Sequence, residues 1–218
     1  NSPANRSFNL HLQELARQRN LDLRNQSRNL GVAASWNYII RAGMEMAYEL
    51  IFIGSNDTLL RPGSLRLVCQ WPKPEEEGLW HIAWFNFFAI HARTVLKVGW
   101  FDENFYPAYL EDLDYKYRCK LAGVRRVHVP GAGARNLGSM SIRSSPRLRR
   151  RCRIAKTRRN RPYYRRKWGG LPGGERFATP FGSTDRDWRW WPDPARHAWR
   201  PAAKPAAPQR TKAGEGPR

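Results

Sequence analysis

The segment Glu49-Leu50-Ile51-Phe52-Ile53-Gly54, followed directly by Ser55-Asn56-Asp57, decides the fold of this chain. A short run that is almost entirely apolar is typical of a strand that is covered on both faces. The run ends abruptly at small polar residues, which are typical of a turn. We therefore predict a buried strand over 49–54 with a polar turn at its carboxyl end.

Helical patterns flank this strand in the sequence. Segment 31–48 places Val32, Trp36, Ile40 and Ala47 on one face, and Pro62 suits the first position of a helix over 62–70. The other predicted elements are helices over 7–19, 92–97 and 110–121, strands over 21–23, 84–91 and 124–129, and a solvated loop over 71–78. Strands that alternate with helices predict a layered α/β fold.

The charge of the chain is unevenly distributed. The 218 residues carry a formal net charge of +21, yet residues 1–120 hold 14 basic and 13 acidic side chains. Segment 143–167 holds 13 basic residues and no acidic one, and the sequence beyond Asp193 is rich in Pro and Ala without periodicity. We predict an α/β domain over 1–142, a basic extension over 143–191 and a disordered tail over 192–218.

Composition argues against several classes of protein. No apolar run approaches the roughly 20 residues that a membrane-spanning helix needs. Cys69, Cys119 and Cys152 are widely spaced and odd in number, which fits neither a zinc site nor a disulfide framework. We expect these cysteines to be reduced and buried.

Asp57 lies two residues beyond the apolar strand, where ligands of α/β sheets usually bind. A carboxylate beside Asn56 and Thr58 can hold a hard divalent cation that also contacts substrate phosphates. An Asx-type turn that caps the strand is the simpler interpretation. The turn alone leaves both interpretations open.

Three carboxylates gather at the start of the helix predicted over 110–121, in Glu111-Asp112-Leu113-Asp114. Their mutual repulsion raises their proton affinity, whereas the helix N-terminus favours the charged form. Asp114 can pair with Arg118 four residues later, which leaves Asp112 available as a general base. A solvated helix start with ordinary N-terminal acids is the alternative.

Four motifs together resemble the family-2 glycosyltransferases of GT-A fold, in the order and at the spacing of that family. The motifs are Asn29 to Asn37 (NLGVAASWN), Ile51 to Leu65 (IFIGSNDTLLRPGSL), Val98 to Glu103 (VGWFDE), and Tyr109 to Arg118 with Gly123. The likeness covers roughly residues 1–142, and Tyr163 to Gly170 with Pro180-Phe181 also looks like the C-terminal extension of some members.

The resemblance implies a three-layer α/β sandwich with a mixed, mostly parallel central sheet that lacks the first strand-helix-strand unit of the family. It implies an inverting transfer of a sugar from a nucleotide-sugar donor to an acceptor hydroxyl of a glycan, lipid-linked or protein acceptor. Asp57 would bind Mg²⁺ or Mn²⁺, and Asp112, within the Glu111-Asp112 pair, would be the general base. The same resemblance places Asn29, Gly31, Asn37 and Asn56 in donor-binding motifs.

Two family positions differ in this chain. Ser55 stands where the family has the first acid of its Asp-x-Asp motif, and Asn136 stands where many members have a metal-binding His. An amide oxygen can ligate a hard cation, although it holds Mn²⁺ less firmly than imidazole does. Asn136 is therefore predicted as a second metal ligand. Trp100, in the loop ahead of the Glu-Asp pair, is a candidate platform for the acceptor sugar.

The basic segment 143–167 suggests two other classes. Arginines with Tyr163, Tyr164 and Trp168 nearby can bind nucleic acid, but the segment lacks any recognisable nucleic-acid fold, so this partner is disfavoured. Polybasic helices also dock on anionic membranes, which suits a transferase with membrane-proximal acceptors and favours a cytoplasmic or membrane-peripheral location. A catalytically inactive remnant is the third interpretation.

Overall fold

The apolar segment forms strand β1 (Leu50–Gly54) of a computed structural model that describes residues 6–19, 21–24, 26, 28–70, 77–138, 143 and 145–183. The other elements, in chain order, are α1 (Arg6–Gln18), α2 (Val32–Glu45), β2 (Thr58–Leu60), α3 (Ser64–Gln70), β3 (Gly78–His81), β4 (Phe87–His91), α4 (Ala92–Val98), α5 (Glu111–Leu121), β5 (Arg125–His128), β6 (Ala134–Asn136), α7 (Pro146–Ala155), a π-helical turn (Lys156–Asn160), α8 (Arg161–Trp168) and a 3₁₀ turn (Pro180–Gly182). The predicted tail over 192–218 lies outside the described residues.

The central sheet has the strand order β1-β4-β3-β5, and β2 pairs with β6 in a separate ribbon. β4 is antiparallel to both of its neighbours, and only β3 and β5 run parallel. The prediction of an α/β fold with a mixed sheet is confirmed, but the prediction that the sheet is mostly parallel is wrong. β3 and β4 are joined by residues 82–86 alone, which is too short for the crossover that parallel strands require.

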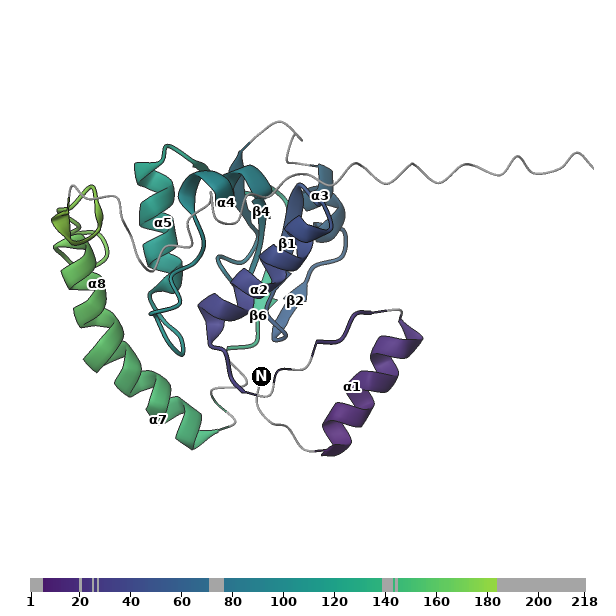
Figure 1. Cartoon of the computed structure of the whole chain (residues 1–218). Coiled ribbons are helices and arrows are strands. Elements are labelled where there is room, and N and C mark those ends of the chain that lie inside the picture. Colours follow the sequence, from purple (N-terminus) through teal and green to yellow (C-terminus); the bar gives the residue numbers. More distant parts are fainter. Residues whose placement is uncertain are drawn as a thin grey trace, which may run out of the picture.

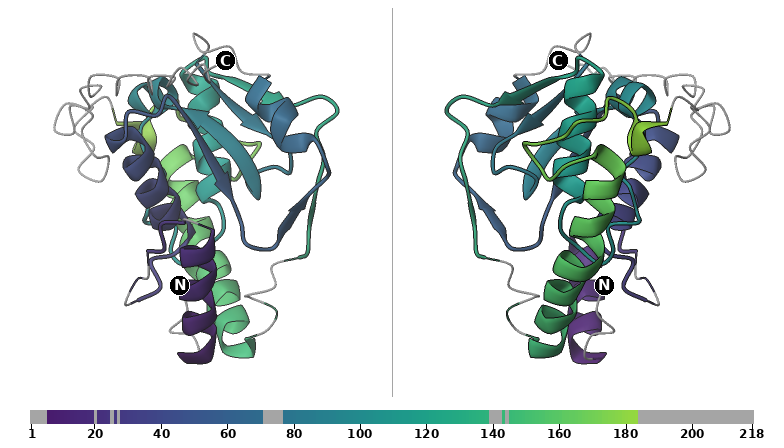
Figure 2. Two further views of the ribbon diagram at one scale, coloured as in Figure 1. Left: turned by 90° about the vertical axis from the view of Figure 1, so that its right-hand side faces the viewer. Right: turned by 90° about the vertical axis from the view of Figure 1, so that its left-hand side faces the viewer.

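Both faces of the sheet are covered, as the composition of β1 predicts. Ile51 and Ile53 pack into the larger apolar cluster, and Leu50 and Phe52 contact the smaller one. The larger cluster contains residues of α2, α4 and α5, whereas the smaller one contains Val68 of α3. Figure 2 shows the sheet between α3 on one side and α2 and α5 on the other.

Several helices and strands agree with the sequence patterns, and one prediction at the N-terminal side fails. α2, α4, α5, β1 and β5 form where they are predicted, within a few residues. The strand predicted over 21–23 does not form, and Leu21 is 62% exposed. α3 begins at Ser64 rather than Pro62, because Arg61 and Ser64 first close a turn.

Within the basic extension, residues 146–168 form one long helical rod, in which the π-helical turn joins α7 to α8 (Figure 1). Figure 1 also shows α8 beside α5, and Trp168 contacts Tyr117 edge-on at 4.9 Å between ring centroids. Tyr164 and Trp168 are fully buried against Phe105 and Leu110. Among the helices that the structure describes, none combines the length and apolar character required to cross a bilayer.

Candidate functional site

The turn after β1 buries Asp57 and brings Asn136 to it. The Ser55 hydroxyl donates to Asp57 Oδ1 at 2.7 Å, and Asn136 Nδ2 donates to the same oxygen at 3.2 Å. The two residues are far apart in sequence, but the β2–β6 ribbon places Thr58 opposite Asn136. The predicted pair of metal ligands therefore lies together in the fold.

The side chains around Asp57 suit a metal ion whose other ligands are substrate phosphates and water. Asn136 Oδ1 accepts a hydrogen bond from the Gly138 N–H at 2.6 Å, so this amide oxygen would have to exchange partners to become a ligand. Within the described part of the chain, no group of three or more His, Cys, Asp and Glu side chains could hold a metal ion. Mg²⁺ is usually held by one or two carboxylates plus substrate phosphates and water, and Asp57 fits that pattern.

The second predicted site lies at the start of α5, where the backbone is held in an unusual conformation. Tyr109 and Leu110 have positive φ angles of 80° and 81°, a region that non-glycine residues rarely occupy. The buried Asn160 Nδ2 donates to the carbonyls of Ala108 and Tyr109 at 2.9 and 3.0 Å. Asn160 thereby holds the segment that orients the first turn of α5.

Glu111 and Asp112 differ in their surroundings. Burial raises the pKa of Glu111 to about 8, and the charges of Asp112 and Asp114 act in the same direction. Glu111 Oε2 is buried without a hydrogen-bond partner among the described residues. Burial also raises the pKa of Asp112, against the opposing effects of the Leu113 N–H, which donates at 2.9 Å, and of Trp84. At neutral pH, Glu111 is protonated and Asp112 is the more accessible carboxylate.

Trp84 is the residue beside Asp112 that the sequence patterns did not indicate. It is 44% exposed and has a φ of 51° in the turn between β3 and β4, and its indole lies near enough to Asp112 to act against the rise in the pKa of that carboxyl. The Lys116 ammonium lies 4.9 Å from the ring centroid. No Gly or Pro marks this turn in the sequence, so residues 84–91 are typical of one continuous strand.

The same turn also contacts the Asp57 turn. The Asn86 carbonyl accepts a hydrogen bond from the Ser55 N–H at 2.8 Å and one from Thr58 Oγ1 at 3.4 Å. Two residues earlier, Trp84 contacts Asp112. One five-residue turn, 82–86, therefore links the predicted metal-binding residue to the predicted base.

The residues predicted for donor binding have structural contacts. Asn37 is buried, and its amide donates to the Phe101 carbonyl at 2.8 Å and accepts from the Phe101 N–H at 2.9 Å. Asn29 Oδ1 accepts from the Gly31 N–H at 2.8 Å, and Gly31 has a φ of 83° at the start of α2. Asn56 is exposed in the turn after β1. Asn29, Gly31 and Asn37 thus hold α2 and the loop ahead of α5 in place.

Trp100 is buried in the larger apolar cluster, with the Arg41 guanidinium 5.5 Å from its ring centroid. Its position favours packing. Trp84, by contrast, combines an exposed ring with a contact to Asp112, so it is the better candidate for a sugar platform.

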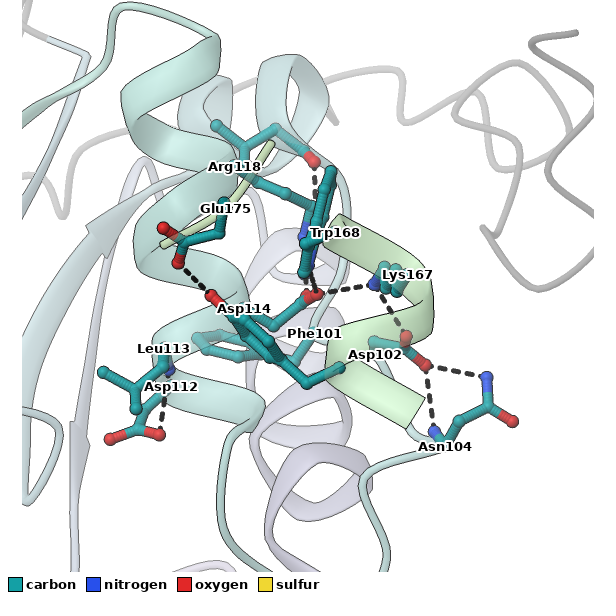
Figure 3. Close-up of polar contacts among 12 residues, drawn as sticks. Phe101, Asp102, Asn104, Asp112, Leu113, Asp114, Arg118, Lys167, Trp168 and Glu175 are labelled. Carbon is teal, nitrogen blue, oxygen red and sulfur yellow. Dashed lines mark hydrogen bonds and ion pairs between the residues drawn. The ribbon is translucent and has the colours of Figure 1, made fainter. Parts of the chain in front are cut away.

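A buried ionic cluster fixes α5 from its other side (Figure 3). Lys167 of α8 is fully buried and lies 2.7 Å from Asp102 Oδ2 and 2.6 Å from Asp114 Oδ1. Asp114 also pairs with Arg118 at 2.8 Å, which confirms the pairing predicted from their spacing, and accepts from the Trp168 indole at 2.8 Å. The cluster joins the basic extension to the helix that carries Glu111 and Asp112.

Comparison of this chain with protein-family models, with curated proteins and with solved structures found no match.

Proposed function

We propose that this chain is a glycosyltransferase that moves a sugar, with inversion, from a nucleotide-sugar donor to an acceptor hydroxyl. The observation that carries the proposal is the turn over 82–86, which contacts the Asp57 turn through Asn86 and Asp112 through Trp84. A group that holds a diphosphate and a group that accepts a proton must both lie near the reacting carbon. The layered α/β fold and the order of the four motifs support a GT-A arrangement.

Asp112 is the proposed general base. It takes the proton of the acceptor hydroxyl while that oxygen forms a bond to the anomeric carbon, and the bond from this carbon to the diphosphate breaks. Because Glu111 is buried and has a pKa of about 8, the neighbouring position is neutral at pH 7. Two carboxyls whose environments push their pKa values apart are typical of acid–base sites. Burial raises the pKa of Asp112, which makes it a stronger base than a solvated aspartate.

Asp57 and Asn136 are the proposed residues on the donor side. They would hold Mg²⁺ or Mn²⁺ through a carboxylate and an amide oxygen, with donor phosphates as the remaining ligands. A divalent cation bound there would neutralise the charge that develops on the departing diphosphate. The Ser55 hydroxyl orients Asp57 through its 2.7 Å hydrogen bond.

Trp84 is proposed to orient both the base and the acceptor. Its indole beside Asp112 would donate to the charged carboxylate, and its exposed ring offers a flat apolar surface for a pyranose.

The test measures release of nucleoside diphosphate from a panel of nucleotide sugars with Mn²⁺ or Mg²⁺. We expect Asp112→Asn to lower kcat by about 10²–10⁴-fold with unchanged folding. Asp57→Asn is expected to lower activity and raise the metal concentration required. Asp22→Asn is the matched control, because Asp22 is exposed and pairs only locally with Arg24.

The outcomes separate the proposal from its alternatives. Full activity in Asp112→Asn would refute the assignment of the base. A wild-type chain that neither binds nor turns over any nucleotide sugar would favour the inactive remnant.

A further inference from the structure

An open cavity of about 610 Å³ lies against α8, and none of its lining residues belongs to the candidate active site. Its lining residues include three arginines, Arg161, Arg165 and Arg166, together with apolar Pro162, Leu171 and Phe177. Leu171 is 39% exposed. The cavity therefore combines concentrated positive charge with accessible apolar surface.

The arginines of this cavity are not paired with acidic side chains in the described part of the chain. None of the three arginines forms an ion pair with a carboxylate of that part. Glu175, the next acidic residue along the sequence, accepts hydrogen bonds from the Tyr164 hydroxyl and the Gly173 N–H. The like charges of three neighbouring arginines favour an anionic ligand.

The arginines are presented from a rigid helix. The opposite face of the same helical segment is anchored by the fully buried Asn160, Tyr164 and Lys167. Because α8 is held at both ends, the positions of Arg161 and Arg165, one turn apart, are fixed relative to each other. Arg161, Arg165 and Arg166 differ from the arginines earlier in the rod in that they line one cavity together with apolar side chains.

We propose that this cavity holds the phosphate headgroup of an anionic lipid, so that the side of α8 that lines it docks on a membrane. Guanidinium groups bind phosphate oxygens through paired hydrogen bonds, which suits the three arginines. A volume of about 610 Å³ exceeds what an inorganic phosphate fills and lies in the range of sites for larger ligands. Leu171 and Phe177 supply apolar contacts for the glycerol backbone and the first methylene groups. This apolar lining favours a lipid over a nucleic acid, and the proposal does not depend on the proposed transferase activity.

The test is co-sedimentation of the protein with phosphatidylcholine vesicles that contain or lack phosphatidylglycerol. The triple variant Arg161→Gln, Arg165→Gln, Arg166→Gln removes the cavity arginines. The matched control, Arg153→Gln, Arg158→Gln, Arg159→Gln, removes the same charge from exposed positions of the rod that do not line the cavity. Urea unfolding checks that both variants remain folded.

We expect binding only to vesicles that contain the anionic lipid. Each basic residue at an anionic surface contributes about a fivefold gain in affinity, so the cavity variant should lose about 100-fold and the control less than tenfold. Equal losses in the two variants would overturn the proposal in favour of diffuse polybasic attraction. Inorganic phosphate that binds the free protein without vesicle association, or single-stranded RNA that binds more tightly than the vesicles and depends on the same arginines, would also overturn it.

Discussion

Replacement of Lys167 by Met is the perturbation that tests most directly how the basic extension is joined to the site. The substitution keeps the length and the apolar stem of the side chain but removes the ammonium that lies 2.7 Å from Asp102 and 2.6 Å from Asp114. Asp114 keeps Arg118 as a partner, whereas Asp102 keeps only neutral donors such as Tyr163 and the Asn104 N–H among the contacts that the structure shows. Breaking a buried ion pair from one side typically costs about 3–5 kcal/mol.

This magnitude is a large part of the stability of a domain, which is typically about 5–15 kcal/mol. With a urea dependence of about 2 kcal/mol per molar, the midpoint of unfolding should fall by about 2 M. Tryptophan fluorescence and far-UV circular dichroism during urea unfolding measure the shift. Arg165→Gln is the control on the same helix, and because Arg165 is exposed we expect a change of about 0.5 kcal/mol or less.

The pH dependence gives a second, independent check. Burial by itself would raise the pKa of Asp102, but Lys167 and the hydrogen bonds to the carboxylate outweigh burial and lower it. A carboxyl with a lowered pKa in the folded state stabilises the protein above its unfolded pKa, and this contribution is lost as the pH falls through the folded value. Without Lys167, burial dominates and the pKa of Asp102 rises. The stability deficit of Lys167→Met should therefore shrink as the pH falls toward 4.

Adding Asp102→Asn to Lys167→Met removes the charge that has lost its ionic partner and should recover part of the loss. The reasoning is refuted if Lys167→Met costs less than about 1 kcal/mol, or if its deficit is as large at pH 4 as at pH 7.

Three further predictions follow from single features of the fold. Glu111→Gln should stabilise the protein by about 3–5 kcal/mol more at pH 9 than at pH 5. The pKa of Glu111 is raised from its ordinary value of 4.5 to about 8 in the folded protein, so wild-type stability falls as the pH rises between these two values. An equal gain at both pH values in urea unfolding would contradict this. Gly31→Ala should cost about 2 kcal/mol or more of stability, because the φ of Gly31 is 83° and the new Cβ would lie 2.8 Å from Tyr106 Cδ2. Gly123→Ala, at a φ of 65° with open space around the new Cβ, should cost about 1 kcal/mol. Equal losses for the two variants in thermal unfolding would exclude the steric argument. A thiol reagent should modify Cys69 in the native protein and reach Cys119 and Cys152 only after unfolding, because both are buried and burial raises their pKa values; rapid labelling of Cys119 in the native state would show that the core opens.

Local patterns predicted what depends on local physics. β1 forms as the apolar run predicts, and α5 begins and ends close to its charge and glycine signals. The Asp114–Arg118 pair follows from helical spacing alone. The expectation of three buried cysteines is right for Cys119 and Cys152 and wrong for Cys69, which is exposed on α3.

Features that depend on contacts between distant parts of the chain could not be predicted from the sequence patterns. The sequence pattern did not predict β3 and the turn before Phe87, because Ile82 to Asn86 contains no turn-forming Gly or Pro. The left-handed φ of Trp84 is also rare for an aromatic residue. The expectation of a mostly parallel sheet came from the family resemblance, and the short turn that makes β3 and β4 antiparallel contradicts it. A lysine within a polybasic run suggests a solvated surface, and nothing local indicates that Asp102, 65 residues earlier, lies against Lys167. The proximity of Asp57 and Asn136 came from the family resemblance, since the ribbon strands β2 and β6 are too short to be recognised.

The π-helical turn over 156–160 allows the rod to hold one extra residue without changing the direction in which its two halves face. A π turn closes i→i+5 hydrogen bonds instead of i→i+4, so deleting one residue from it would restore ordinary α-helical geometry and leave the orientation of α7 relative to α8 almost unchanged. Arg151, which donates to the Tyr106 hydroxyl at 3.0 Å, and the buried Cys152 would keep their directions, as would the anchors of α8. A one-residue deletion within α7 itself would instead rotate the residues before it by about 100°. The π turn is therefore the position in the basic extension where a change of chain length is best tolerated.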